Sequence, residues 1–262
     1  MSANSTEIEE WLQRTGYPLE MRVAKEFRTK RPAFVEQSYF YHDVATGEVR
    51  EGDVLASWST SPGDWLQLLF AVECKSSGVP WVVFTEGRER LEPLDFRRWL
   101  DATPSIGLSA KRIVELGARI KRFPIPLLTM SKSPGYGIVE KKDEGKQRGG
   151  GASLAYDAVR QAASFALGIA GRANSGDAEV SNGEEPDYTS IIFPIVVTKS
   201  PIFECWLNSD NLPTARQVDS SSVVVYLGKP ARHVVVTVVN DNNIAQLADA
   251  CLRTATALSE RA

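Results

Sequence analysis

An acidic and a basic side chain stand together at the end of an apolar run in FAVECKSS, residues 70–77. The first three residues of this segment are apolar, as in a buried strand, and a carboxylate, a thiol and an ammonium group follow at once. Because side chains alternate along a strand with a period of two, Glu73 and Lys75 point to the same face. The pattern therefore predicts an acid and a base side by side at the end of a core strand.

A second carboxylate, Asp53, lies in another apolar alternation, VREGDVLASW, residues 49–58. If the two strands pair as neighbours, Asp53 and Glu73 meet at one end of a sheet with Lys75 beside them. Two carboxylates within hydrogen-bonding distance repel each other unless a cation lies between them. Oxygen ligands favour Mg²⁺, which keeps several waters and completes its octahedron with substrate phosphate oxygens. We therefore expect Mg²⁺ as the cofactor, with Mn²⁺ as a substitute.

This arrangement resembles the PD-(D/E)xK nuclease superfamily, whose members have the restriction-endonuclease-like fold. The matching parts are a glycine-aspartate pair, an E-x-K triplet at a strand end and an acidic residue in the preceding helix: Gly52, Asp53, Glu73, Cys74, Lys75 and Glu20. Gly52 departs from the motif, since many members have proline there. The resemblance covers residues 15 to 85, and beyond them only the pattern of elements matches.

The resemblance implies a role for each of these residues. Asp53, Glu73 and the backbone carbonyl of Cys74 would bind the metal. Lys75 would position or activate the attacking water, and Glu20 would support the water shell of the metal. The competing interpretation is an ordinary ion pair between Glu73 and Lys75 with a solvated Asp53, and exposed pairs of that kind contribute little. Three acids that converge without a metal are costly, which favours the metal site.

The segments around these residues predict an α/β fold with a mixed central sheet flanked by helices. A short helix capped by Ser5 or Thr6 precedes a second helix that has Pro18 at its first position and carries Glu20. Residues 34–58 form a hairpin, and the strand that ends at Lys75 follows. The next apolar segment, PWVVFTE, begins so soon afterwards that we expect an adjacent strand or a continuation of the same edge.

The rest of the chain predicts further helices, C-terminal strands and a closing helix. Helical patterns occupy about 93–100, 109–121 and 153–170, and Gln161 and Phe165 in the last of them resemble a glutamine and aromatic pair found in some branches of the superfamily. An acidic stretch at about 172–188 indicates a flexible linker. Four later apolar runs are expected to extend the central sheet, and a helix from about Asn243 to Ser259 closes the fold.

Positive charge is concentrated in one region of an otherwise acidic chain. Residues 111–148 contain ten Lys or Arg and four acids, a local charge of +6, whereas the whole chain carries −3. Such an asymmetry suits a surface that follows phosphates. Within a basic insertion at about 105–150 we expect the nucleic-acid-binding residues to be Lys141, Lys142, Lys146 and Arg148. A solvated basic loop is the alternative.

Length and composition indicate one globular unit spanning residues 1–262. Its 43% apolar and 24% charged residues are typical of a soluble protein, and no apolar run approaches the ~18 residues of a membrane helix. The three cysteines are widely spaced, which argues against disulfides and zinc and favours a reducing cytoplasm. The oligomeric state stays open, and a homo-oligomer is among the states allowed.

The function expected from these patterns is a Mg²⁺-dependent nuclease, an endonuclease acting on DNA rather than RNA. By resemblance, it would be a prokaryotic restriction or defence protein. Two alternatives remain. A binding module on a nuclease-like fold would keep the basic region without cleavage, and a hydrolase of small nucleotides would have a narrow closed pocket in place of an open groove.

Overall fold

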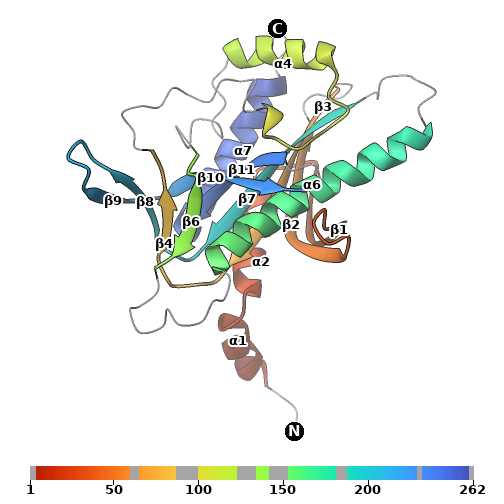
Figure 1. Ribbon diagram of the computed structural model, residues 1–262. Helices are drawn as coiled ribbons and strands as arrows, with labels where there is room; N and C mark the ends of the chain where they lie inside the picture. Colours follow the sequence, from red (N-terminus) through yellow and green to blue (C-terminus); the bar gives the residue numbers. More distant parts are fainter. Residues whose placement is uncertain are drawn as a thin grey trace.

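The computed structural model describes seven stretches of the chain, residues 4–59, 65–86, 100–122, 134–141, 153–180, 188–228 and 232–259. They form two sheets with helices packed around the larger one (Figure 1). The larger sheet has the strand order β1 (Phe34–His42), β2 (Val49–Ser59), β3 (Leu66–Lys75), β7 (Thr189–Thr198), β11 (Arg232–Asn240) and β10 (Ser220–Leu227), and the short β5 (Ser105–Ile106) pairs with β7.

The larger sheet is mixed, as the sequence predicts. Strands β1, β2 and β3 form an antiparallel meander, whereas β7 lies parallel to both β3 and β11. Three of the four C-terminal strand segments, β7, β10 and β11, extend this sheet. The fold is therefore α/β, with the meander at one side and the parallel strands in the middle.

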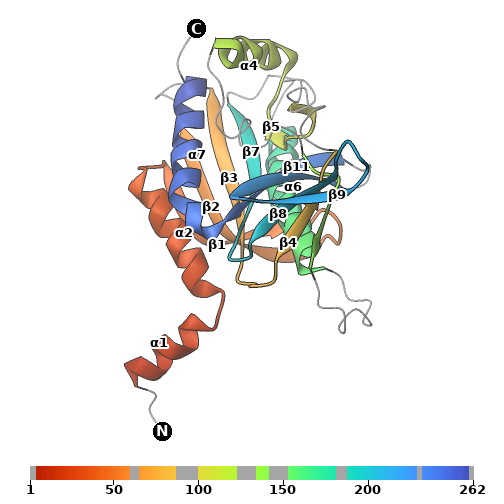
Figure 2. The same ribbon diagram turned by 90° about the vertical axis from the view of Figure 1, so that its left-hand side faces the viewer.

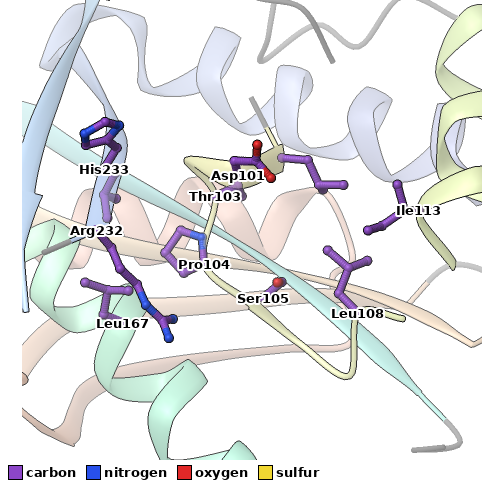
Figure 3. A pocket seen from close by; sticks show the side chains of 11 residues that line it. Asp101, Thr103, Pro104, Ser105, Leu108, Ile113, Leu167, Arg232 and His233 are labelled. Atoms are coloured by element: carbon purple, nitrogen blue, oxygen red, sulfur yellow. The ribbon is translucent and has the colours of Figure 1, made fainter. Parts of the chain in front are cut away.

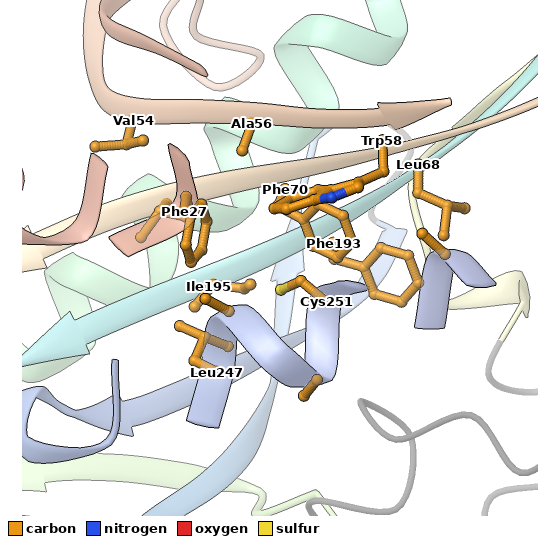
Figure 4. Packing of buried hydrophobic residues seen from close by; sticks show 14 of the residues in the cluster. Phe27, Val54, Ala56, Trp58, Leu68, Phe70, Phe193, Ile195, Leu247 and Cys251 are labelled. Carbon is orange, nitrogen blue, oxygen red and sulfur yellow. The ribbon is translucent and has the colours of Figure 1, made fainter. Parts of the chain in front are cut away.

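Helices cover both faces of the larger sheet. The helices α2 (Tyr17–Thr29) and α7 (Ile244–Ser259) lie on one face and α6 (Leu154–Val180) crosses the other (Figure 2). The α2/α7 face holds a core of large side chains, among them Phe27, Trp58, Phe70, Phe193 and Leu247 (Figure 4). On the opposite face, α6 packs against alternate residues of the same strands, including Leu55, Leu69 and Ala71. Strands covered on both faces read as continuous apolar runs.

The segment PWVVFTE corrects the sequence prediction, because it neither pairs with β3 nor continues it. It forms β4 (Trp81–Phe84) in a second sheet with the order β6 (Gly137–Glu140), β4, β8 (Ile202–Leu207), β9 (Pro213–Val218). β8 also belongs to this second sheet and does not extend the central sheet, which corrects the expectation for its segment. The parallel neighbours β3 and β7 both end before a proline, Pro80 or Pro201, which cannot donate to a ladder. β4 and β8 then pair in parallel again, and Trp81 is fully buried.

The first helix, α1 (Ser5–Gln13), projects from the body of the protein toward the N-terminus (Figure 1). Its cap is Asn4 and not Ser5 or Thr6. The Asn4 side chain accepts from the Glu7 backbone N–H at 2.9 Å, and the Glu7 carboxylate accepts from the Asn4 N–H at 3.1 Å. Asparagine caps as well as serine and better than threonine, and the reciprocal bond fixes the start.

The basic region is partly structured. Its helix α4 (Ala110–Arg122) agrees with the predicted 109–121, but two of its arginines serve packing. The Arg112 and Arg119 guanidinium groups lie 4.1 and 5.0 Å from the centre of the Trp65 ring, and Arg119 donates to the Leu258 carbonyl while buried. Lys141 is exposed just after β6, and the predicted partners Lys142, Lys146 and Arg148 lie outside the described residues.

The helix α6 is longer than predicted. It continues to Val180, so that residues 172–180 are helical and not part of a linker, while 181–187 lie outside the described residues. Extending an existing helix fixes one residue per added hydrogen bond, and the single Gly176 lowers helix stability by only about 1 kcal/mol. Within the described stretches, no helix combines the length and hydropathy needed to cross a membrane.

Candidate functional site

Asp53 and Glu73 lie opposite each other where the β2–β3 ladder ends. The last paired residues are Val54 and Val72, and one step further brings Asp53 to face Glu73. Here the Asp53 carboxylate accepts a hydrogen bond from the Cys74 backbone N–H, at 2.6 Å. A side chain thus takes the place of the backbone ladder. This is the meeting of two carboxylates at a sheet end that the strand spacing predicts.

Lys75 lies on the same face as Glu73, as the alternation predicts. Its ammonium nitrogen is 3.2 Å from Glu73 Oε2. The Glu73 side chain is 4% exposed and that of Lys75 is 20% exposed, so the lysine forms the border between the buried carboxylate and solvent. An ion pair this shielded is screened less by salt than a surface pair.

An open cavity of about 330 Å³ lies over these residues. Its lining comes from β1, the following turn, β2, β3 and α6 and comprises Tyr41, Glu48, Arg50, Glu51, Asp53, Glu73, Lys75 and Gln161. Four carboxylates face two cations, a formal charge of −2. With its carboxylates ionised, the cavity attracts cations and repels a polyanion until positive charge is supplied.

Glu20 lies close to this group but outside the lining of the cavity. It stands in the first turn of α2, and its carboxylate folds back toward Gly16, where an added Cβ would be 3.5 Å from Glu20 Oε1. Partial burial raises the pKa of Glu20 to about 7, and the negative charges of Asp53 and Glu51 contribute. The carboxylate is thus coupled to the site through its charge and can exchange a proton near neutral pH.

The two facing carboxylates favour protonation when no cation is present. Burial, followed by the charge of Asp53, raises the pKa of Glu73 to about 8. Burial also raises the pKa of Asp53, against the opposing effects of the Cys74 N–H and Lys75. The Cys74 thiol has its pKa raised by burial and stays protonated, so that this residue can offer only its backbone.

The backbone carbonyl of Cys74 is a further oxygen donor beside the two carboxylates. Residues alternate in the direction of their backbone groups along a strand, and Lys75 uses its carbonyl to accept from Lys199 N–H on the β7 side. Cys74 therefore directs its carbonyl to the other side, where its N–H meets Asp53. Across the described part of the chain, no three His, Cys, Asp or Glu side chains gather around one point. Two carboxylates, one carbonyl and waters are a donor set of the kind that Mg²⁺ uses.

Gln161 lies in this cavity, on α6, and its amide oxygen is buried without a hydrogen-bond partner within the described structure. A buried acceptor left unpaired is unfavourable by about 1–3 kcal/mol, so this oxygen is available to accept from a group that enters the cavity. The predicted pair of Gln161 and Phe165 thus consists of a residue in the cavity and a residue that packs beneath it.

Phe165 explains why glycine occupies position 52. A Cβ at Gly52 would lie 2.4 Å from the Phe165 ring, closer than any side chain permits. The ring is fully buried and stacks on Tyr41 with centroids 4.9 Å apart, so it cannot retreat. The glycine lets α6 approach β2 at the residue before Asp53, and proline would not fit there.

Ser38 marks a distortion of β1 directly opposite Asp53. The register pairs Gln37 with Val54 and Tyr39 with Gly52, and Ser38 between them has φ 59°. Val35 packs toward the α2/α7 core, yet Tyr39 packs toward α6, although an even spacing in a regular strand keeps one face. A left-handed serine is unfavourable by about 1–2 kcal/mol, and such strain gathers at functional sites.

Four members of the cavity were not predicted from the sequence, namely Tyr41, Glu48, Arg50 and Glu51. Tyr41 and Arg50 are partners in the β1–β2 register, and only this register brings them over the site. The available signal was the hairpin itself, since counting back from its turn pairs position 41 with position 50. Without the face change at Ser38, the count gives the partner but not the direction of the side chains.

A second cavity of about 340 Å³ lies between the residues after 100, α6 and the start of β11 (Figure 3). It is lined by one carboxylate, Asp101, together with hydroxyl and apolar groups, Arg232 and His233. His233 is exposed and packs edge-on against Tyr226 at 4.2 Å, and His42 is exposed at the end of β1. Neither histidine has an acidic partner within the described ion pairs. The second cavity therefore lacks the paired acid and base that line the first cavity, and the first is the stronger candidate.

Comparison with known proteins finds no match: no family model, no curated protein and no solved structure is similar to this chain. Function must therefore be inferred from the chain's own residues and their geometry.

Proposed function

We propose that the protein is a Mg²⁺-dependent nuclease that hydrolyses phosphodiester bonds, on a fold of the restriction-endonuclease type. The observation that carries the proposal is the group at the broken end of the β2–β3 ladder, where Asp53, Glu73 and Lys75 face one open cavity. The chain order of helix α2, meander β1–β2–β3, crossover helix α6 and parallel strand β7 supports it. In this order, Glu20 lies on a helix, Asp53 on a hairpin, and Glu73 and Lys75 at the end of the next strand.

The side chains that we propose as metal ligands are held in place by the protein itself. Asp53 is fixed by the Cys74 N–H, and Glu73 is buried beside Lys75. These two carboxylates and the Cys74 carbonyl would hold Mg²⁺, which when bound would polarise the scissile phosphate and lower the pKa of water. Groups that need not reorganise during the reaction stabilise a transition state most effectively.

Lys75 and Glu20 would act on the proton and charge of the reaction. The Lys75 ammonium, at the border of the cavity, would orient the attacking water and offset negative charge that develops on the phosphate. Glu20 would accept hydrogen bonds from waters near Asp53, and its pKa of about 7 lets it take or release a proton at neutral pH.

The proposed substrate is a nucleic acid, DNA in preference to RNA. A cavity with a formal charge of −2 repels a phosphate until its metal is bound, and the chain supplies further positive charge in the basic region. Exposed Lys141 after β6 belongs to that region. We assign to this lysine and its basic neighbours in the sequence the role of holding the phosphate backbone at a distance from the metal.

The proposal is tested by incubating the purified protein with supercoiled plasmid, single-stranded DNA, RNA and free nucleotides. Each is treated with Mg²⁺, Mn²⁺ or EDTA. We expect cleavage of a polymer with either metal and none with EDTA. Hydrolysis of free nucleotides alone would instead favour a small-nucleotide hydrolase.

A non-cleaving binding module is the second candidate. The observation that favours it is that, among the described residues, no third acidic side chain joins Asp53 and Glu73 in a metal-binding group, and Glu20 is not part of the cavity lining. In a binding module, Lys75 is one strand-end charge among many, and its removal would change little. In a nuclease, the same removal would abolish most cleavage and leave metal binding intact.

A further inference from the structure

Arg50 lines the same cavity as the proposed catalytic group. It precedes Asp53 by three residues on β2, a distance of about 10 Å along an extended strand. Its register partner Tyr41 lines the cavity beside it. The Arg50 side chain is 38% exposed, so part of its guanidinium group faces solvent.

The Arg50 guanidinium is held by a carboxylate that is itself fixed. Asp43 is 6% exposed, and its Oδ1 accepts the backbone N–H groups of Ala45 at 2.8 Å and Thr46 at 3.2 Å. Its other oxygen, Oδ2, lies 3.0 Å from Arg50 Nε. The nearest further carboxylate, Glu48, is 4.0 Å from Nη2, beyond direct hydrogen bonding.

This arrangement leaves the outer edge of the guanidinium available to a ligand. The planar fork presents five N–H donors, and only Nε is engaged at hydrogen-bond distance among the described contacts. Arginine matches phosphate in two-pronged geometry, and an arginine held by a buried acid loses less side-chain entropy when it binds. A fixed cation in the lining of an acidic cavity favours an anion beside it.

We propose that Arg50 binds a phosphate that flanks the scissile phosphate, so that the substrate is a strand with at least two phosphates. This inference rests on the proposed nuclease function. Arg50 stands about 10 Å from Asp53 along β2, more than the rise of one nucleotide, so the second phosphate belongs to a nearby nucleotide of the same strand. Asp43 is the positioning residue for Arg50.

The test compares Arg50→Ala and Arg50→Lys with the parent on two substrates, a short oligonucleotide and bis(4-nitrophenyl) phosphate, which has a single phosphodiester. For the oligonucleotide we expect KM to rise about tenfold in Arg50→Ala with a smaller change in kcat, and Arg50→Lys to recover part of it. In Arg50→Ala, the kcat/KM for the oligonucleotide divided by the kcat/KM for bis(4-nitrophenyl) phosphate should fall about tenfold. Exposed Arg253 on α7 provides the matched control, Arg253→Ala.

Salt dependence and the positioning residue give two further readouts. The slope of log binding constant against log salt, measured with the oligonucleotide and Ca²⁺, should decrease by about 0.7–0.9 in Arg50→Ala, the value for one phosphate contact. Asp43→Asn can still accept from the turn N–H groups but loses the charge that holds Arg50. Asp43→Asn should therefore raise KM, but by less than Arg50→Ala does. Its melting temperature is measured beside that of the parent as a control for folding.

The outcomes separate this inference from the proposed function. If the parent cleaves the oligonucleotide and Arg50→Ala matches it in KM and salt slope, Arg50 does not bind the strand, although the nuclease proposal stands. Equal losses on both substrates would place Arg50 at the scissile phosphate and overturn the flanking role. If the parent neither cleaves nor binds any oligonucleotide, both proposals fail together.

Discussion

Replacing Glu73 with glutamine should stabilise the metal-free protein at alkaline pH. Burial and the charge of Asp53 raise the pKa of Glu73 from 4.5 to about 8, which means that ionising it in the folded state is unfavourable. Between these two values, the folded protein holds a proton that the unfolded chain has released. The contribution of Glu73 to stability is therefore greatest below about pH 4.5 and falls as pH rises toward about 8.

The pKa increase sets the size of this effect. A change from 4.5 to about 8 corresponds to at most about 5 kcal/mol, at about 1.36 kcal/mol per pKa unit. The ion pair with Lys75 at 3.2 Å, which Glu73→Gln weakens, offsets part of this. We expect a net gain of about 1–2 kcal/mol at about pH 8, which raises the melting temperature by about 2–8 °C, and almost none at about pH 5.

The assay is thermal unfolding in EDTA, followed by circular dichroism, of the parent, Glu73→Gln and Glu10→Gln at both pH values. Glu10 is an exposed acid on α1 and serves as the matched control. Mg²⁺ added at about pH 8 should raise the melting temperature of the parent, because metal binding requires ionised carboxylates, and should have a smaller effect on Glu73→Gln. A parent that is equally stable at both pH values, or a Glu73→Gln variant that is less stable at the higher one, would refute the repulsion between the two acids.

Substitutions at three further positions test other parts of the site. Lys75→Ala should retain calorimetric Mg²⁺ binding and DNA binding while plasmid nicking slows about a hundredfold or more, and equal nicking would leave the lysine without a catalytic role. Gly52→Ala should lower the free energy of unfolding by about 1–3 kcal/mol, since its methyl group meets the Phe165 ring, and unchanged denaturant midpoints would contradict that contact. Ser38→Val should destabilise more than Ser38→Gly in the same denaturant titration, because a β-branched residue tolerates positive φ least, and the reverse order would argue against the distortion opposite Asp53.

The sequence predicted the parts of the site that depend on local order. Period-two alternation places Glu73 and Lys75 on one face, and a hairpin followed by a strand brings Asp53 to the same end. These relations need only the identity of each strand and its neighbour. For the same reason the helix α2, the hairpin and the closing helix α7 were predicted close to their observed bounds.

The remaining features depend on contacts between distant segments, which local patterns do not encode. β4 follows β3 after five residues yet pairs with β8, more than a hundred residues away, because the chain passes from the larger sheet into the second sheet after both of the neighbours β3 and β7. The approach of Phe165 to Gly52 likewise joins α6 to β2. Arg50 was not predicted, because period-two alternation counted from Asp53, three residues away, places its side chain on the opposite face.

The most direct test of the metal site is the Mg²⁺-dependent rate of polymer cleavage by the parent and by Asp53→Asn. Asparagine keeps an oxygen that can accept from the Cys74 N–H, so the fold is retained while one metal-binding charge is lost. We expect the parent to cleave supercoiled plasmid with Mg²⁺ and not with EDTA, and Asp53→Asn to be slower by about three orders of magnitude, about 4 kcal/mol of transition-state stabilisation. Cleavage by Asp53→Asn at the parent rate, or no cleavage of any nucleic acid by the parent, would contradict the assignment.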